Sequence, residues 1–279
     1  MPEGHTLFRL ARDLRERFAG SSVRVTSPQG RFAEAAALLD RSVLRDATSW
    51  GKHLFIDFDG DRLVHVHLGL YGRFDIIDSD RPEPPVGQVR LRLQSSTAYA
   101  DLRGATTCDL ITSQQQDLII DRLGPDPLRP DADPLRAWAR IHRSRLPIGA
   151  LLMDQQVLAG VGNVYRAEVL YRQRIDPQRP GNTVRRGQFL ALWSDLVDLM
   201  AEGVRVGRID TVRPEHTPEA MGRAPRVDDH GGEVYVYRRT GQPCFVCGSQ
   251  VRTSVLQQRN LFWCPRCQPK FRSRATTPR

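Results

Sequence analysis

The sequence predicts an α+β protein with more than one domain. An apolar pattern with helical spacing opens the chain, strand-like segments follow over residues 22–104, and helical periodicity takes over beyond residue 133. A chain of 279 residues is long enough to bury two cores. Residues 124–132 are rich in proline, glycine and aspartate, so we place the linker between the domains there.

The first domain, residues 1–123, is expected to begin with a helix that ends at Gly20, because glycine suits a helix C-cap. The apolar positions of this helix are Leu7, Leu10, Ala11, Leu14 and Phe18. Strands with one buried face are expected at 54–58, 63–67 and 89–94, and a helix interrupts them at 33–39. Many short strands between Gly and Asp turns favour a sandwich or a barrel.

The second domain, residues 133–232, is expected to be helical. Asp133 caps its first helix, which has Pro134 in the first turn. Further helices are expected at 148–156, 164–171 and 189–200. Polar residues 205–232 favour a long mobile loop, residues 233–239 have the pattern of a strand, and the basic residues 269–279 favour a disordered tail.

The net charge of +9 and the pI of about 9.9 favour a polyanionic partner, most simply nucleic acid. A basic balance is weak support when it stands alone. The sequence has no apolar run of about 18 residues and no signal-peptide pattern, so we expect a soluble, cytoplasmic protein without a membrane partner.

Lysine is rare in this chain. Of the 41 basic residues, 39 are arginines and two are lysines, Lys52 and Lys270. Arginine stays protonated, whereas a buried lysine can titrate. A lysine that persists against this bias is a candidate for chemistry that needs an amine. Lys52 precedes a strand, whereas Lys270 lies in the basic tail.

The chain begins with Met1-Pro2-Glu3. Removal of Met1 before the small Pro2 would leave a secondary amine at the chain start, followed at once by the Glu3 carboxylate. A nucleophilic amine and an acid would then stand at the N-terminus of a helix. The plain alternative is an ordinary first turn, in which an acid suits the helix dipole.

Four cysteines form two CxxC pairs, separated by sixteen residues: Cys244, Cys247, Cys264 and Cys267. This spacing is typical of a four-cysteine zinc ribbon with one structural ion. Two disulfides are the alternative, and a cytosolic protein with an odd fifth cysteine, Cys108, disfavours them. A closed shell of four thiolates folds the hairpin rather than performing chemistry. Arg259 lies between the two pairs, where a hairpin tip could present it to a phosphate.

Two glycine-rich turns are candidate contacts for nucleic acid. Residues 158–163 join two helical segments, so Gly162 and Asn163 could donate to a phosphate at a helix N-terminus; a plain turn between helices is the alternative. In residues 67–73 two glycines bracket Leu70 and Tyr71, a pair that could fill the gap left by a flipped base or pack in the core. Histidines 53, 65 and 67 are unlike a metal site, because no acidic partner stands at ligand spacing.

Taken in order, these motifs resemble the formamidopyrimidine-DNA glycosylase / endonuclease VIII family of base-excision repair enzymes. The resemblance covers nearly the whole chain. It is carried by Pro2-Glu3-Gly4, Gly51-Lys52, the 67–72 turn, Arg122-Leu123-Gly124-Pro125-Asp126, the 158–163 turn, and Arg259 ahead of Trp263-Cys264-Pro265-Arg266-Cys267-Gln268.

The resemblance implies a β-sandwich behind the N-terminal helix, a helix–two-turn–helix domain, and a zinc ribbon over residues 233–268. It implies a DNA glycosylase and abasic-site lyase that acts on damaged double-stranded DNA, as a monomer associated with the nucleoid and without an organic cofactor. Pro2 would attack C1′ and form an iminium, Glu3 would act as the acid, and Lys52 would assist β-elimination. Arg122, Asn163 and Arg259 would grip phosphates, and Arg259 would also support δ-elimination.

The endonuclease VIII branch is favoured, and with it oxidised pyrimidines. The 67–72 turn carries Leu70-Tyr71 where enzymes for 8-oxoguanine usually carry methionine, and residues 101–105 lack the phenylalanine of their Arg-Arg-Phe-Gly run. Gly69 replaces the glutamine of bacterial endonuclease VIII. An 8-oxoguanine/formamidopyrimidine glycosylase of the same family is the first alternative. A non-catalytic zinc protein that binds DNA damage is the second.

Overall fold

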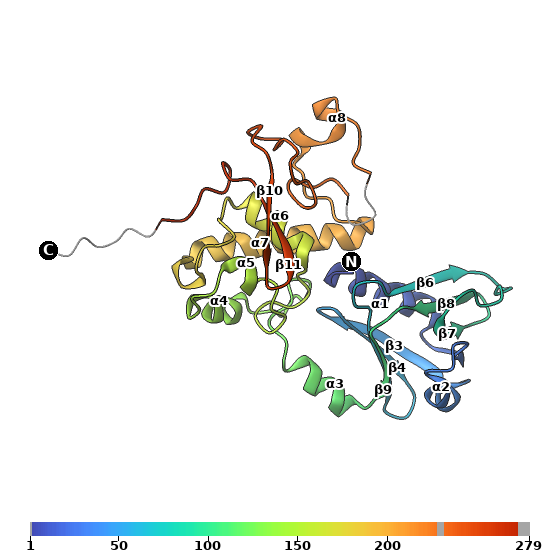
Figure 1. Cartoon of the computed structure of the whole chain (residues 1–279). Coiled ribbons are helices and arrows are strands. Elements are labelled where there is room, and N and C mark those ends of the chain that lie inside the picture. Colours follow the sequence, from blue (N-terminus) through green and yellow to red (C-terminus); the bar gives the residue numbers. More distant parts are fainter. Residues whose placement is uncertain (1, 228–231, 273–279) are drawn as a thin grey trace. The chain divides into compact units, whose positions relative to one another are not determined.

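The computed structural model describes residues 2–227 and 232–272, and the chain divides into two compact units, Met1–Leu123 and Gly124–Arg279 (Figure 1). Each unit has a hydrophobic core of its own. None of the helices in the described residues is long and apolar enough to cross a membrane.

The first unit opens with helix α1 (Gly4–Phe18), which buries Leu7, Ala11, Leu14 and Phe18. These four side chains share one face because they are spaced three, four or seven residues apart. The helix ends before Gly20, whose φ of 77° continues the chain into the first strand.

Two antiparallel sheets form the sandwich predicted for this unit. The first has the order β1 (Ser21–Ser22), β3 (Val43–Trp50), β4 (His53–Phe58), β5 (Arg62–His67), β9 (Thr107–Ile111). The second has the order β2 (Arg24–Thr26), β7 (Val89–Gln94), β8 (Ala98–Arg103), β6 (Arg73–Asp78). Leu54 and Ile56 of one sheet and Leu91 and Leu93 of the other belong to a single buried cluster. Two further helices are α2 (Ala33–Leu39), as predicted, and α3 (Ser113–Ile120).

The second unit is helical, as expected. Its elements are α4 (Pro134–His142), α5 (Ile148–Leu151), α6 (Asn163–Arg172), η1 (Gly181–Thr183), α7 (Arg186–Val206), η2 (Pro214–His216), α8 (Pro218–Met221) and the hairpin β10 (Arg252–Leu256) and β11 (Arg259–Trp263). The helix expected over 148–156 is shorter than predicted: α5 ends at Leu151, and two tight turns follow before α6.

The strand predicted at 233–239 is wrong, because these residues form an irregular loop around a buried carboxylate. Glu168 of α6 is fully buried, and its two oxygens accept hydrogen bonds from the backbone N–H groups of Tyr235, Val236 and Tyr237 at 2.7–2.9 Å. The Thr211 hydroxyl donates to the same carboxylate at 2.6 Å. Since these N–H groups converge on one side chain, they are unavailable to a strand partner.

The loop expected over 205–232 has local structure in its described part. Helix α7 continues to Val206, and η2 and α8 follow it. Residues 228–231 of this prediction lie outside the described residues, as do residues 273–279 of the predicted tail. The tail begins ordered, since the Phe271 N–H donates to Asp176 Oδ2 at 2.8 Å and the Arg179 guanidinium stacks on the Phe271 ring.

Candidate functional site

Helix α1 runs antiparallel to β3. The Gly20 N–H donates to the Leu44 carbonyl at 2.8 Å, and one helical turn earlier Arg15 donates to Asp46 at 2.5 Å and to the Ala47 carbonyl at 2.8 Å. Residue numbers therefore fall along the helix while they rise along the strand.

This direction places the start of α1 at the end of β3. From Arg15 back to Gly4 the helix spans about 16 Å, and five residues of strand beyond Ala47 span about the same length. Pro2 and Glu3 thus lie at the level of the turn that contains Lys52. Arg17, near the C-terminus of α1, donates to Asp78 at the end of β6 at 2.6 Å. The start of β6 therefore lies near the N-terminus of α1.

We call this end of the first unit the α1 N-terminal edge. Its members are Pro2, Glu3, the Gly51-Lys52 turn, His67 and the turn of Leu70 and Tyr71. The sequence motifs of this edge lie far apart in the chain, near residues 2, 50 and 70. The antiparallel packing of α1, β3, β5 and β6 brings them to one end of the sandwich.

Glu3 is fully buried, although carboxylates are rarely buried without a partner or a function. It has extended backbone (φ −120°, ψ 179°), precedes the first helical residue and makes no side-chain cap. The next histidine, His5, is also buried, and this burial, together with the charge of Arg9, lowers its pKa to about 4. The start of α1 is therefore an enclosed acidic position beside a neutral imidazole.

Gly51 and Lys52 form a two-residue hairpin turn, because Trp50 pairs directly with His53. The positive φ of 57° falls on Gly51 and not on Lys52, which is the pattern of a type II′ turn. Glycine at the first position thus fixes the lysine at the tip of the hairpin. This explains locally why the Gly-Lys pair occurs here.

Three histidines gather beside this lysine. His53 Nδ1 lies 2.9 Å from His65 Nε2, and the His53 ring centroid is 5.1 Å from those of His65 and His67. Burial lowers the pKa of His53 to about 3 and that of His65 to about 4, and the Lys52 charge contributes to the shift of His53. The cluster is therefore neutral near pH 7. Within residues 2–227 and 232–272, the group of side chains that could hold a metal ion does not include these histidines.

The 67–73 turn exposes both of its apolar side chains. Leu70 is 39% exposed and Tyr71 is 87% exposed, so the alternative that they pack in the core is wrong. The glycines on either side are required by space: a Cβ on Gly69 would lie 2.4 Å from Thr106 Cγ2, and one on Gly72 would lie 2.3 Å from the Leu68 carbonyl oxygen. Arg122 is also exposed, beyond α3.

The turn at 158–163 in the second unit is fixed by one side chain. Gln155 Oε1 accepts from the Gly160 N–H at 3.0 Å, and its Nε2 donates to the Val161 carbonyl at 2.9 Å. Gly162 takes the N-cap position of α6, and Asn163 is its first residue.

Asn163 connects this helix start to the hairpin that carries Arg259. Its Nδ2 donates to the Asn260 carbonyl at 3.0 Å, and its Oδ1 accepts from Arg166. The buried Arg166 also donates to the Asn260 carbonyl at 3.0 Å and to the Gly149 carbonyl at 3.2 Å. Since Asn260 is the next residue after Arg259, the predicted phosphate turn and the predicted arginine share one set of contacts.

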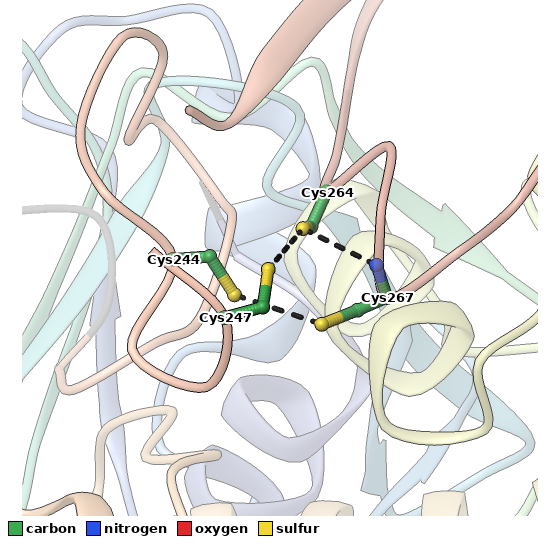
Figure 2. Close-up of side chains that lie close together, drawn as sticks. All are labelled: Cys244, Cys247, Cys264 and Cys267. Atoms are coloured by element: carbon green, nitrogen blue, oxygen red, sulfur yellow. Dashed lines mark hydrogen bonds between the residues drawn. The ribbon is translucent and has the colours of Figure 1, made fainter. Parts of the chain in front are cut away.

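The four cysteines converge, with their Sγ atoms all within 4.8 Å of one another (Figure 2). The Cys244–Cys267 and Cys247–Cys264 Sγ separations are 3.8 and 3.4 Å. Tetrahedral zinc with Zn–S bonds of about 2.3 Å requires sulfur atoms about 3.8 Å apart, so the set fits the ion. All four are free thiols, which excludes the two-disulfide alternative from this structure.

Two side chains attach the ribbon to α6 and to the residues that follow it: Tyr171, which the sequence analysis did not single out, and Gln268, which it named only as the end of a motif. The Tyr171 hydroxyl lies 3.0 Å from Cys244 Sγ. Gln268 Oε1 accepts from the Cys264 N–H at 3.0 Å, while its Nε2 donates to the Ile175 carbonyl at 3.0 Å. Arg166, Asn260 and Glu168 were also missed. Their partners are distant in the chain, so no local pattern indicates them.

Three domain families match this chain: the formamidopyrimidine-DNA glycosylase N-terminal domain over residues 1–108, the formamidopyrimidine-DNA glycosylase H2TH domain over 123–214, and the zinc finger found in FPG and IleRS over 241–270. The fold and the four-cysteine site therefore define a DNA glycosylase that is also an abasic-site lyase of base-excision repair, with a structural zinc finger.

The chain belongs to the formamidopyrimidine-DNA glycosylase family, as its relatives also show. "Endonuclease 8 1" of Mycobacterium tuberculosis (strain ATCC 25618 / H37Rv) is 55% identical over 275 residues, which are 96% of this chain and 100% of the relative. "Formamidopyrimidine-DNA glycosylase" of Pseudoalteromonas atlantica is 30% identical over 81% of this chain and 82% of its own length. The fold matches that of Lactococcus lactis Fpg, solved with DNA that contains an abasic site, with a TM-score of 0.77, 22% identity and coverage of 96% and 100% of the two chains.

Proposed function

We propose that this chain removes oxidised pyrimidines from double-stranded DNA and then cleaves the abasic site by β,δ-elimination, with Pro2 as the nucleophile. The observation that supports this most directly is the antiparallel packing of α1 on β3. It sets the start of α1 and the Lys52 turn at one edge. An amine, an acid and a second amine are the groups that such a reaction needs.

The chemistry follows from these groups. The Pro2 nitrogen, free once Met1 is removed, attacks C1′ of the damaged nucleoside, and Glu3 supplies a proton as the base or the ring oxygen departs. Once the base has left and the C1′–O bond of the ring has opened, the nitrogen keeps its new bond to C1′ as an iminium, which acidifies C2′. Lys52 assists proton transfer while the C3′–O bond breaks, and Arg259 supports loss of the 5′ oxygen. The products are the free base, a one-nucleotide gap with phosphate at both ends and, after hydrolysis of the iminium, free enzyme and an unsaturated aldehyde from the sugar.

The protein's other groups bind rather than react. Leu70 and Tyr71 fill the space of the flipped nucleotide, and Gly162, Asn163 and Arg122 contact phosphates. Bound zinc would hold the ribbon folded through Cys244, Cys247, Cys264 and Cys267, and no organic cofactor is needed. We expect a monomer that works in the cytoplasm on nucleoid DNA.

The identity of 55% to proteins named "Endonuclease 8 1", against 30–32% to proteins named formamidopyrimidine-DNA glycosylase, supports the endonuclease VIII branch, although a "Probable endonuclease 8 2" is also only 30% identical. Parallel cleavage of duplexes with thymine glycol, 5-hydroxyuracil and 8-oxoguanine tests it. We expect the two pyrimidine lesions to be cut faster. Equal or better cleavage of 8-oxoguanine opposite cytosine would assign the chain to the other branch.

Borohydride reduction with abasic-site DNA tests the nucleophile. Protein that starts at Pro2 should form a covalent complex, Pro2→Gly should trap weakly, and a retained Met1 or an N-terminal tag should abolish trapping. Absence of any complex with Pro2-started protein would refute the lyase and favour a damage-binding zinc protein.

A further inference from the structure

A cavity of about 220 Å³ lies at the C-terminal end of α6. None of the residues proposed above for catalysis or for DNA binding lines it. Its walls include Arg172, Arg174, Arg213, Glu215, His216 and Tyr235. The predicted phosphate turn is at the other end of the same helix, about 15 Å away along the axis. The cavity is therefore a separate place on the second unit.

Arg174 occupies a position that normally belongs to glycine. It follows the C-cap Gln173 of α6 and has a left-handed φ of 54°. The Ile175 N–H donates to the Leu170 carbonyl at 2.9 Å, which is the closing bond of a Schellman motif. An L-residue with a side chain costs about 1 kcal/mol in this conformation. Arg41 and Arg238 also have a left-handed φ, so the conformation by itself assigns no role to Arg174, but it means that glycine would suit this backbone position.

The arginines of the cavity differ in their pairing. Arg172 is bound to Asp195 at 2.6 Å and to the Thr211 carbonyl at 2.6 Å, so its charge is offset. Within residues 2–227 and 232–272, the guanidinium groups of Arg174 and Arg213 make no hydrogen bond or ion pair. These two arginines, which are both exposed, line the same small cavity as Glu215.

His216 adds a further nitrogen to the set. The Tyr235 hydroxyl accepts from the Arg213 N–H at 2.9 Å and lies 3.0 Å from His216 Nδ1. Because Nδ1 is engaged by this hydroxyl, Nε2 is the ring nitrogen that can donate to a ligand. Glu215 opposes an anion, but its carboxylate is 60% exposed and therefore well screened by water.

We propose that this cavity binds a phosphate group, held by Arg174 and Arg213 with His216 as an additional donor. Guanidinium groups match the oxygens of a phosphate, two arginines line this cavity, and its volume accommodates the group. The group can belong to a free phosphate or to the backbone of DNA bound by this unit. Cys267 lines the same cavity, so occupancy should also slow loss of zinc from the ribbon.

Titration of the zinc-loaded full-length protein with inorganic phosphate, followed by calorimetry and by the rate of zinc transfer to a chelator, tests the free-ion source. We expect saturable binding and slower zinc transfer in the wild type. Arg174→Gly should bind phosphate at least tenfold more weakly, while its folding is preserved because glycine suits this backbone. Glu215→Gln should bind a few-fold more tightly, and Arg205→Gln on α7 should match the wild type.

The DNA source is tested by the salt dependence of duplex binding. If a backbone phosphate occupies the cavity, the slope of log K against log salt should fall in magnitude by about 0.9 in Arg174→Gly. Either result supports the site and identifies its source. The proposal is overturned if wild type and Arg174→Gly bind phosphate alike and also share one salt slope. The phosphate titration is independent of the proposed function. A protein that bound phosphate but not DNA would refute the proposed function and leave the phosphate site standing.

Discussion

Arg15 of α1 donates to Asp46 of β3 at 2.5 Å, and this contact fixes the direction in which the first helix lies along the sheet. Both side chains are about half exposed, so the pair indicates the geometry more than it stabilises it. The stronger restraint is the buried face of α1, which includes Leu14. The position of Pro2 relative to Lys52 thus depends on the core of the first unit.

Substitutions in α1 should separate these two contributions. Leu14→Ala should lower the free energy of unfolding by about 2–5 kcal/mol, because it leaves a cavity in the core. Arg15→Ala should cost less than about 1 kcal/mol, as expected of an exposed pair. Urea denaturation of the two variants measures both values. A larger loss for Arg15→Ala would show that the ion pair, rather than the core, positions α1.

The buried histidines should make the protein sensitive to acid. The unfolded chain takes up protons near pH 6.5, whereas folded His53 and His65 do so only near pH 3 and 4. Their contribution is therefore full above pH 6.5 and is lost as the pH falls toward 4, by at most about 1.4 kcal/mol per pH unit and group.

Unfolding free energies measured between pH 7 and 4.5 check this slope. His53→Phe keeps a stacked ring without a titrating group, so its stability should fall less steeply with acid than that of the wild type. His142→Gln is a matched control, since His142 is exposed. Parallel slopes for the wild type and His53→Phe would contradict the assignment of neutral histidines.

Zinc binding should depend on four of the five cysteines and not on the fifth, Cys108. We expect one zinc per chain by mass spectrometry, its loss in Cys264→Ser, and its retention in Cys108→Ala, because Cys108 is buried in the other unit. Chelation should unfold the hairpin, displace Arg259 and weaken DNA binding. Full DNA affinity after complete removal of zinc would show that the folded ribbon is not needed for DNA binding.

Sequence patterns predicted the helices and strands whose buried residues recur at regular spacing within a short segment. The helix at 33–39 and the strands of the sandwich follow from spacing that stays visible in short windows. Helix α3 was missed although its signal is present, since Thr112 and Gln115 form a capping box. The error at 233–239, where a strand was predicted, could not be corrected from the sequence. The N–H groups of this segment donate to Glu168, which lies 67 to 69 residues earlier in the chain.

The candidate site shows the same limit. The residue types of Pro2, Glu3 and Lys52 suggest the chemistry proposed for them, and the cysteine spacing indicates a metal. The supporting residues act over long sequence separations: Asn163 and Arg166 reach Asn260 from 97 and 94 residues away. Motifs therefore indicate which groups react, and only the fold shows which groups hold them.

Glu168 should be essential for the fold of the second unit. In Glu168→Gln an amide N–H₂ replaces one acceptor oxygen and faces backbone N–H groups, so we expect a loss of about 3 kcal/mol or more. Hydrogen exchange at residues 235–237 should accelerate. Glu219→Gln, on the exposed helix α8, is the control and should change neither quantity. Unchanged protection in Glu168→Gln would mean that other contacts hold this loop.

Arg166 should affect DNA binding without touching DNA. It is 1% exposed and holds the Asn260 carbonyl, so Arg166→Met should release the hairpin beside Arg259 and weaken binding while the salt slope stays unchanged. Arg259→Gln, by contrast, should remove a phosphate contact and reduce the slope by about 0.9. The two changes should be less than additive when combined, because both disable the same arginine. Arg166→Lys controls for loss of charge, and zinc content and thermal unfolding confirm that each variant is folded. A reduced slope in a folded Arg166→Met variant would instead place this arginine among the direct phosphate contacts.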